Sequence, residues 1–186
     1  MSAFYLTLIA VLFSGLGARD QMTVADLSHR RTRRVAVLLI GAILSIGTAA
    51  FAGWAATLIA PLMQPPARVF LCALALFFAG AESLVLKPRV GKGEPTHSLV
   101  AVAVVLSIHQ LTDSPRFVIF GIAVATNAPE TVAGGGALGG IVLLAIAWAL
   151  PRYVLNPKVR IARGFIGVGF LLLGSYVALR ALNLVG

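Results

Sequence analysis

The amino-acid sequence predicts an all-α integral membrane protein, and three observations lead to that fold class. Of the 186 residues, 59% are hydrophobic and only 11% are charged, and the mean hydropathy is +0.97. A soluble domain carries about a quarter charged residues and needs polar side chains to cover its surface. Apolar runs long enough to cross a bilayer recur along the chain, and basic residues gather between them.

Six apolar segments account for the predicted membrane spans, since a bilayer core needs roughly 20 apolar residues per helix. The first is expected to be a retained span, because it lacks the basic start and the cleavage site of a signal peptide. It contains the pair Arg19–Asp20, because the following QMTVADL continues the span. The fourth carries the polar run HQLTDSPR, in which Pro115 is expected to kink or open the helix. The approximate bounds of the spans are 3–27, 35–61, 67–86, 98–126, 131–150 and 162–183.

The remaining spans carry features that are typical of helix packing. Cys72 lies in the apolar run of the third span and is expected to be a packing residue. The fifth span begins with AGGGALGG, whose small residues let helices approach closely. This run lacks the Lys-Ser/Thr end of a phosphate loop, so packing is the favoured interpretation.

Basic residues alternate between the connecting segments, and this pattern predicts the topology. Segments 28–35, 87–97 and 151–163 are basic, whereas the second and fourth connections offer only Arg68 and the acidic Glu130. The positive-inside rule places the three basic loops in the cytoplasm and both termini outside it. An inner (plasma) membrane is expected by analogy. The basic loop residues are Arg30, Arg31, Arg33, Arg34, Lys87, Arg89, Lys92, Arg152, Lys158, Arg160 and Arg163.

The two halves of the sequence resemble each other at a constant spacing. GWAATLIAP around Trp54 resembles AWALPRYVL around Trp148, and FFAGAESLVL resembles LLLGSYVAL, both at an offset of 94 residues. Each half holds three spans, so the second enters the membrane from the opposite side, as in many secondary transporters. The predicted organisation is a first three-helix repeat at 1–90, a cytoplasmic linker at 87–97 and an inverted three-helix repeat at 97–186.

Ionisable residues inside spans cost about 2.5–3.5 kcal/mol each on insertion scales, so they indicate either a functional site or structural ion pairs. Asp113 is the centre of the predicted ion site, because Pro115 opens the helix beside it and Gln110, Thr112 and Asp20 add oxygen atoms. Hard cations prefer such ligands, and Asp113 and Gln110 are the predicted metal ligands. The candidates inside spans are Arg19, Asp20, Glu82, His109, Asp113 and Arg116.

Each of these candidates also has a structural interpretation. Arg19, Arg116 and Glu82 are expected to act as ion-pair or gating groups, and Asp113 could simply bond to Arg116 at a helix kink. His109 is either a proton relay or a hydrogen-bonded packing group. Glu82 lies about one turn from Lys87 and could pair with it at the membrane interface.

The layout resembles the Gdt-type cation/proton exchangers (uncharacterised protein family 0016), small membrane proteins with two inverted three-span repeats. Each repeat of that family opens with Glu-x-Gly-Asp-[Lys/Arg]-[Ser/Thr], usually followed by Gln. The first motif here reads GLGARDQ, with Gly15 in place of the Glu and Ala18 in place of the Asp. The second reads QLTDSPR, in which Asp113 keeps the pattern and Gln110 stands for the Glu.

The resemblance implies a secondary transporter that exchanges manganese or calcium for protons around Asp113. Two alternatives stay open: a non-transporting membrane subunit, and an exporter of a small anionic or organic solute with the arginines as ligands. No enzyme activity and no cofactor are expected, because no nucleophile–base or metal-ligand constellation is visible. The expected partners are the lipid bilayer and a metal ion or proton, and a homo- or hetero-oligomer stays open. Nucleic acid is not expected despite the net charge of +9, because the basic residues gather in loops.

Overall fold

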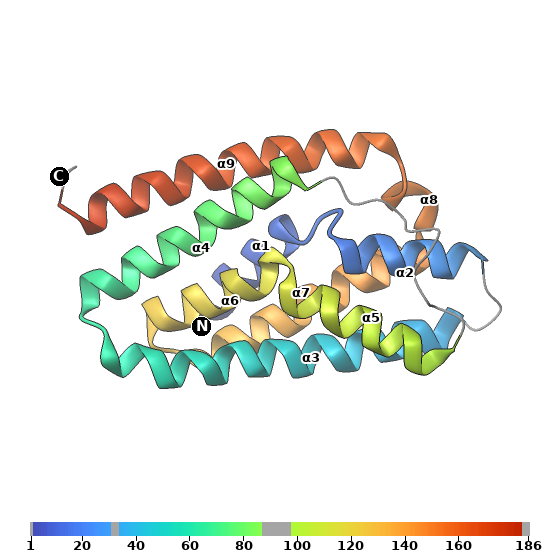
Figure 1. The fold of residues 1–186 in the computed structure, drawn as a ribbon, viewed down its shortest axis with the longest axis horizontal. Coiled ribbons are helices and arrows are strands. Elements are labelled where there is room, and N and C mark those ends of the chain that lie inside the picture. The colour runs from blue at the N-terminus through green and yellow to red at the C-terminus, as the bar shows by residue number, and fades with distance from the viewer. Residues whose placement is uncertain (1, 31–33, 87–97, 184–186) are drawn as a thin grey trace.

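The computed structural model describes residues 2–30, 34–86 and 98–183. All regular elements within these ranges are helices, which confirms the predicted all-α class. In chain order they are α1 (Ser2–Ser14), α2 (Arg19–Arg30), α3 (Arg34–Ile59), the short 3₁₀ helix η1 (Ala60–Leu62), α4 (Pro65–Val85), α5 (Leu99–Thr112), α6 (Ser114–Thr126), α7 (Pro129–Ala149), α8 (Pro151–Val154) and α9 (Pro157–Ala181) (Figure 1).

Four helical segments are long and apolar enough to cross a membrane, namely Val35–Leu62, α4, α7 and α9. They correspond to four of the predicted spans. Helices α1 and α2 meet at an angle of 64° and make a fifth candidate if the pair is one span. Helices α5 and α6 are shorter apolar helices on either side of Asp113, at the place where Pro115 predicts an interruption. The chain therefore folds as a helical bundle with the apolar lengths of a membrane-embedded protein.

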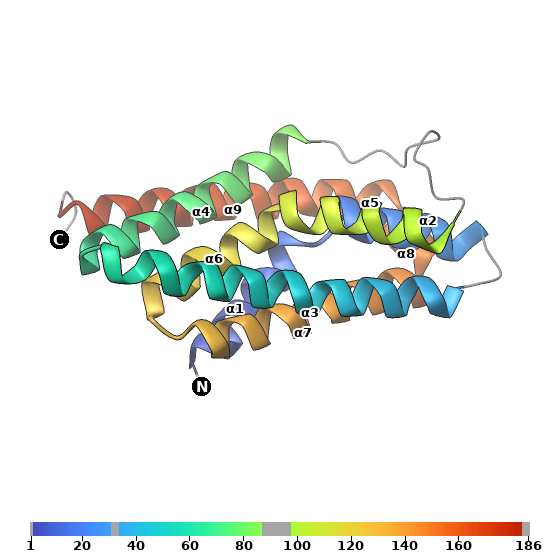
Figure 2. The same ribbon diagram turned by 60° about the horizontal axis from the view of Figure 1, so that its bottom comes forward.

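The helices run along one common direction, and the two helix breaks lie near the middle of the bundle's length (Figures 1 and 2). The C-terminal end of α2, the start of α5 and α8 lie at one end of the bundle, whereas η1 and the C-terminal end of α9 lie at the other (Figure 1). Helix α4 packs along α9, and α3 packs along α7. The polar breaks are thus held at the depth that would be furthest from water in a bilayer.

Small residues bring the backbones of paired helices together. A Cβ atom on Gly80 of α4 would lie 2.6 Å from the Gly167 carbonyl oxygen of α9, so only glycine fits there. Gly135 of α7 faces the backbone of α1 at Phe4 in the same way. The AGGGALGG run therefore serves helix packing, as the sequence predicts.

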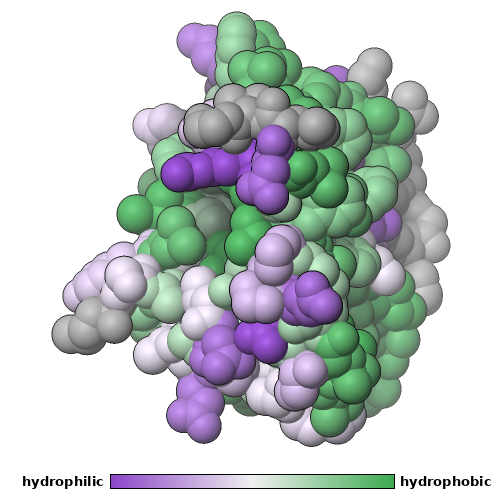
Figure 3. All heavy atoms as spheres, turned by 90° about the vertical axis from the view of Figure 1, so that its left-hand side faces the viewer, coloured by the Kyte–Doolittle hydropathy of each residue, from purple (hydrophilic) through white to green (hydrophobic). Residues whose placement is uncertain are grey.

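The exterior of the bundle is apolar along its sides. Large hydrophobic side chains from several helices are exposed there, including Ile43 (67%), Phe165 (76%) and Leu172 (68%). In the view onto one end of the bundle, polar residues gather on the end face while apolar residues cover the flanks (Figure 3). Apolar flanks with buried charges inside are the pattern of a protein that has lipid as its lateral solvent.

One expected loop is helical instead. The segment 151–163 contains α8 and the first turns of α9, because Pro157 occupies the first turn and the Asn156 side chain accepts a hydrogen bond from the Lys158 amide (2.9 Å). Arg163 is consequently not a loop residue. Its side chain lies inside the bundle, with the residue only 2% exposed.

Candidate functional site

The first helix break, between α1 and α2, is held open by a glycine and by side chains from other parts of the chain. Gly17 has a φ of +67°, the left-handed conformation that side chains disfavour. Its amide donates to the Gln21 Oε1 atom (2.6 Å), and its carbonyl accepts a hydrogen bond from Arg163 Nη1. The side-chain nitrogen of Gln21, Nε2, donates to the Leu143 carbonyl of α7 (3.1 Å). Backbone groups that the break removes from helical pairing thus regain partners.

The second helix break is a single residue, Asp113, in extended conformation between α5 and α6. Its amide still donates to the His109 carbonyl (2.9 Å), so α5 ends there, and its own carbonyl accepts from the Arg116 amide (3.1 Å) as α6 begins. Pro115 in the first turn of α6 has no amide hydrogen to donate and favours an extended conformation before it. The break therefore follows directly from the local sequence.

An ion pair joins the two breaks. Arg19, the first residue of α2, places Nε 2.7 Å and Nη2 2.6 Å from the Asp113 Oδ1 atom, and Nη2 also donates to Thr112 Oγ1 (3.1 Å). The Asp113 side chain is 2% exposed, whereas the Arg19 side chain is 35% exposed. The second carboxylate oxygen of Asp113, Oδ2, is buried and makes no hydrogen bond with the described part of the chain. One oxygen of this carboxylate is therefore engaged by Arg19 and the other is not.

Arg116 is buried among neutral oxygen atoms. Its Nε donates to Thr48 Oγ1 (2.7 Å), and its Nη2 donates to Ser45 Oγ (3.3 Å) and to Gln110 Oε1 (3.2 Å). The Gln110 amide nitrogen in turn donates to the Gly41 carbonyl (3.2 Å). No ion pair joins Arg116 to a carboxylate of the described residues. Asp113 thus lies at the expected helix break, but its carboxylate pairs with Arg19 and not with the Arg116 guanidinium.

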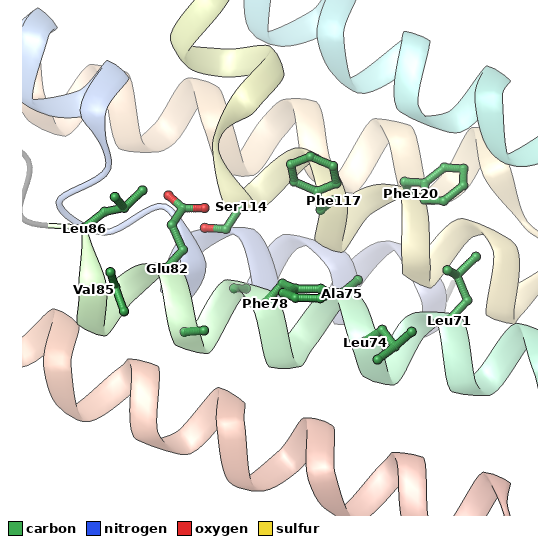
Figure 4. Close-up of a pocket in the computed structure, with 12 residues that line it drawn as sticks. Leu71, Leu74, Ala75, Phe78, Glu82, Val85, Leu86, Ser114, Phe117 and Phe120 are labelled. Carbon is green, nitrogen blue, oxygen red and sulfur yellow. The ribbon is translucent and has the colours of Figure 1, made fainter.

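Glu82 and Arg163 form a second, looser pair. The Arg163 Nη2 atom lies 3.5 Å from Glu82 Oε1, and the two side chains are 3% and 15% exposed. The Glu82 carboxylate points from α4 toward Ser114 at the N-terminus of α6 (Figure 4), a position where the helix dipole favours a negative charge. The predicted pairing of Glu82 with Lys87 concerns a residue outside the described ranges.

The other predicted site residues lie around these pairs. Asp20 is half-buried, accepts a hydrogen bond from the Gln21 amide at Oδ1 (2.7 Å) and interacts electrostatically with Asp113 and Arg116. The His109 Nδ1 atom lies 3.4 Å from Thr23 Oγ1, about one helical turn from Asp113. The structure thus gathers the predicted residues of both halves at mid-length of the bundle.

Three residues that contact the predicted site residues are missing from the predicted site. Ser45 and Thr48 supply the oxygen atoms for Arg116, and their spacing of three in an otherwise apolar span marks one face of a helix. The sequence pattern places Arg163 in a basic loop. The helix-start signal Asn156–Pro157, six residues earlier, is the feature that identifies it as a charge within a helix.

The donor set does not match a preformed site for a divalent metal. Within the described ranges, no group of three or more His, Cys, Asp or Glu side chains is arranged to hold a metal ion. The Oε1 atom of Gln110, a predicted ligand, already accepts hydrogen bonds from Arg116 and Thr48. Oδ1 of Asp113 is engaged by Arg19, which leaves Oδ2 as the available oxygen of the predicted pair.

The formal charges of the cluster cancel. Three guanidinium groups face three carboxylates within the bundle, and each carboxylate is in electrostatic range of at least one of them. Since an isolated charge is costly in an apolar medium, this balance lets the cluster exist at membrane depth. The six residues are Arg19, Asp20, Glu82, Asp113, Arg116 and Arg163.

Comparisons with known proteins give no match: no family model fits the chain, and neither curated proteins nor solved structures align with it significantly.

Proposed function

We propose that the protein is a secondary transporter that exchanges a cation for protons at the cluster between the two helix breaks. The observation that carries this proposal is the Arg19–Asp113 pair, which joins the two breaks and leaves one carboxylate oxygen of Asp113 without a hydrogen bond. Interrupted helices with charged residues at mid-membrane are the usual setting of ion sites in secondary transporters.

The order of the helices supports two inverted halves. A broken pair, α1–α2, is followed by the long helices α3 and α4, and the broken pair α5–α6 is followed by the long helices α7 and α9. Helices α2 and α6 begin at residues 19 and 114, and α3 and α7 begin at 34 and 129, which is a spacing of 95 residues in both cases. If each broken pair counts as one span, each half has three spans and the chain has six. We propose this six-span topology with the basic loops in the cytoplasm.

The proposed exchange uses Arg19 as an internal cation. With Arg19 on Asp113 the pair is neutral, and a proton or a transported cation that reaches Oδ2 competes with Arg19 for the same carboxylate. Arg19 has room to move because its side chain is one-third exposed, whereas Asp113 is fixed by burial. Proton and cation thus exclude each other at one carboxylate, and this competition is the coupling that an exchanger needs.

Flux in proteoliposomes tests the proposal. Uptake of manganese, calcium, sodium and an organic cation is measured with an imposed pH gradient, for the wild type and for Asp113→Asn. We expect proton-coupled flux of at least one cation and its loss in Asp113→Asn, because the amide cannot exchange a proton. The control is Glu130→Gln, an exposed residue at the start of α7, which should transport as the wild type does. Folded wild-type protein with no proton-coupled flux of any of these ions would contradict the proposal.

A non-transporting membrane subunit is the second candidate, and one observation favours it. The two acids Asp113 and Glu82 already face arginines, as they would if the pairs only held the helices together. This candidate predicts that replacing Arg19 and Asp113 together by neutral amides leaves the protein stable and its biological role intact, because a purely structural ion pair can be replaced. The exchange proposal predicts loss of flux in the same double variant.

A further inference from the structure

An apolar groove runs between α4 and α6, beside the cluster but distinct from the Arg19–Asp113 pair. Its volume is about 600 Å³, within the range of roughly 300–1,000 Å³ that is usual for small-molecule sites. Aromatic and aliphatic side chains form its walls, and polar side chains occur only at one end (Figure 4). The lining residues at that end are Glu82 and Ser114, and the main wall residues are Leu71, Leu74, Phe78, Val85, Phe117 and Phe120.

The polar end of the groove contains a hydroxyl group without a partner. Ser114 is 1% exposed and lines the groove, and its Oγ atom makes no hydrogen bond with the described residues. Buried hydroxyls almost always have a hydrogen-bond partner in folded proteins. Ser114 can therefore offer a hydrogen bond to a polar atom of a ligand at this end of the groove.

Glu82 sets the charge of that ligand. It is the charged residue among those that line the groove. Its partner Arg163 lies outside the lining, at 3.5 Å, which is longer than an ordinary charge-assisted hydrogen bond. The carboxylate thus keeps the capacity to accept a hydrogen bond from inside the groove. A negative group at the end of an apolar channel, with aromatic faces nearby, selects a cation over an anion.

We propose that this groove binds an amphiphilic organic cation, and, resting on the proposed function, that such a monovalent cation is the transported substrate. Its apolar body lies along Phe78, Phe117 and Phe120, and its cationic head lies at Glu82 and Ser114. The groove opens on the apolar flank, since Phe78 and Phe117 are 62% and 51% exposed. A molecule that partitions into the bilayer can therefore enter it sideways.

Charge and position link this groove to the exchange site. Ser114 follows Asp113 directly, and Glu82 interacts electrostatically with both Asp113 and Arg19. The bare cluster is formally neutral, so a monovalent cation adds the same single charge that a proton would add, whereas a divalent metal would add two. A monovalent organic cation therefore substitutes for a proton without a change in the charge of the cluster.

The test compares two ions of the same shape and opposite charge. Binding of tetraphenylphosphonium and of tetraphenylborate to the full-length protein is measured by equilibrium dialysis in nanodiscs of zwitterionic lipid, with empty nanodiscs subtracted. We expect saturable binding of the phosphonium at one site and no saturable binding of the borate. Equal binding of both ions, or no binding above that of empty nanodiscs, would overturn the proposal; the second result would mean that the groove holds only lipid chains.

Variants locate the site within the groove. Glu82→Gln should weaken phosphonium binding by about tenfold or more, and Phe117→Ala by about threefold. Phe165→Ala removes an exposed aromatic side chain (76%, against 51% for Phe117) from α9 outside the groove and should bind as the wild type does. Because Glu82→Gln leaves Arg163 unpaired, the double variant Glu82→Gln/Arg163→Gln provides a neutral background in which the same loss is expected. Unchanged affinity in both Glu82 variants would refute the site.

The outcomes separate this proposal from the proposed function. Phosphonium binding with the expected variant effects, without proton-coupled flux of any cation, would sustain the groove as a cation site and refute transport. Proton-coupled flux of a metal without phosphonium binding would sustain exchange and refute the groove as the substrate site.

Discussion

Removing Arg19 should destabilise the protein more than removing the charge of Asp113. The two charges lie in different surroundings, because the Asp113 side chain is 2% exposed and that of Arg19 is 35% exposed. Arg19→Gln leaves a buried carboxylate without its ion-pair partner, whereas Asp113→Asn leaves a partly exposed guanidinium that keeps its hydrogen bond to Thr112 Oγ1 (3.1 Å).

The magnitudes follow from burial. Two unit charges about 4 Å apart attract each other by roughly 4 kcal/mol at an effective dielectric constant of 20. Loss of one partner of a buried pair costs about 3–5 kcal/mol, and this range applies to Arg19→Gln because the remaining charge is fully buried. For Asp113→Asn we expect about 1–2 kcal/mol, since the remaining charge is partly exposed. The double variant should recover about 2 kcal/mol relative to Arg19→Gln.

The single cysteine of the chain provides the assay. Cys72 lies in α4 and is half-buried, so a thiol-reactive fluorogenic maleimide will label it faster as the bundle unfolds in detergent on heating. At about 2–4 °C per kcal/mol, Arg19→Gln should lower the unfolding temperature by roughly 6–20 °C and Asp113→Asn by roughly 2–8 °C. Arg180→Gln, exposed at the end of α9, is the control and should change it little. Equal shifts for the two single variants, or no recovery in the double variant, would refute the reasoning.

Three further substitutions and one control test the breaks and the packing, the first break and the Arg116 network by the same thermal assay and the close packing of α4 on α9 by size-exclusion chromatography. Gly17→Ala should cost about 1–2 kcal/mol because of the left-handed backbone, whereas Gly164→Ala, with open space around the new methyl group, should be neutral or slightly stabilising. Thr48→Val should cost about 1–3 kcal/mol because it removes the acceptor of the Arg116 Nε hydrogen bond. Gly80→Leu should prevent α4 from packing on α9 and give little folded protein in size-exclusion chromatography, and a normal yield would contradict the close-packing account.

The sequence predicts the long helices and one of the two breaks. Helices α3, α4, α7 and α9 follow from apolar length alone, because a bilayer imposes it. The break at Asp113 follows from Pro115, whose missing amide hydrogen is visible in any sequence. The break at Gly17 was not predicted, since the glycines near it are also compatible with a continuous packed helix, and the partners that hold it open come from Arg163 and α7.

The pairing of the charges could be predicted only in part. The sequence identifies Arg19, Asp113, Arg116 and Glu82 as charges inside spans, but several pairings of them balance equally well. What decides the pairing is the contact between the start of α2 and the end of α5, which brings Arg19 to Asp113 across 94 residues of chain. Arg163 then takes the position beside Glu82, although its place in a basic segment suggested a loop.

The three arginines of the cluster differ in a way that bears on which of them can move. Arg116 divides its hydrogen bonds among three neutral acceptors, so displacing it would leave several polar atoms without partners. Displacing Arg163 would take the hydrogen bond from the Gly17 carbonyl at the first break and the ion-pair partner from Glu82. Among the described residues, Arg19 bonds to Asp113 and Thr112, and its side chain is the most exposed of the three. A proton on Asp113 removes the charge that holds Arg19 and leaves the other two networks intact. A change at the ion pair can therefore proceed while Arg116 and Arg163 keep their contacts, and the exchange that we propose depends on this separation of moving and fixed charges.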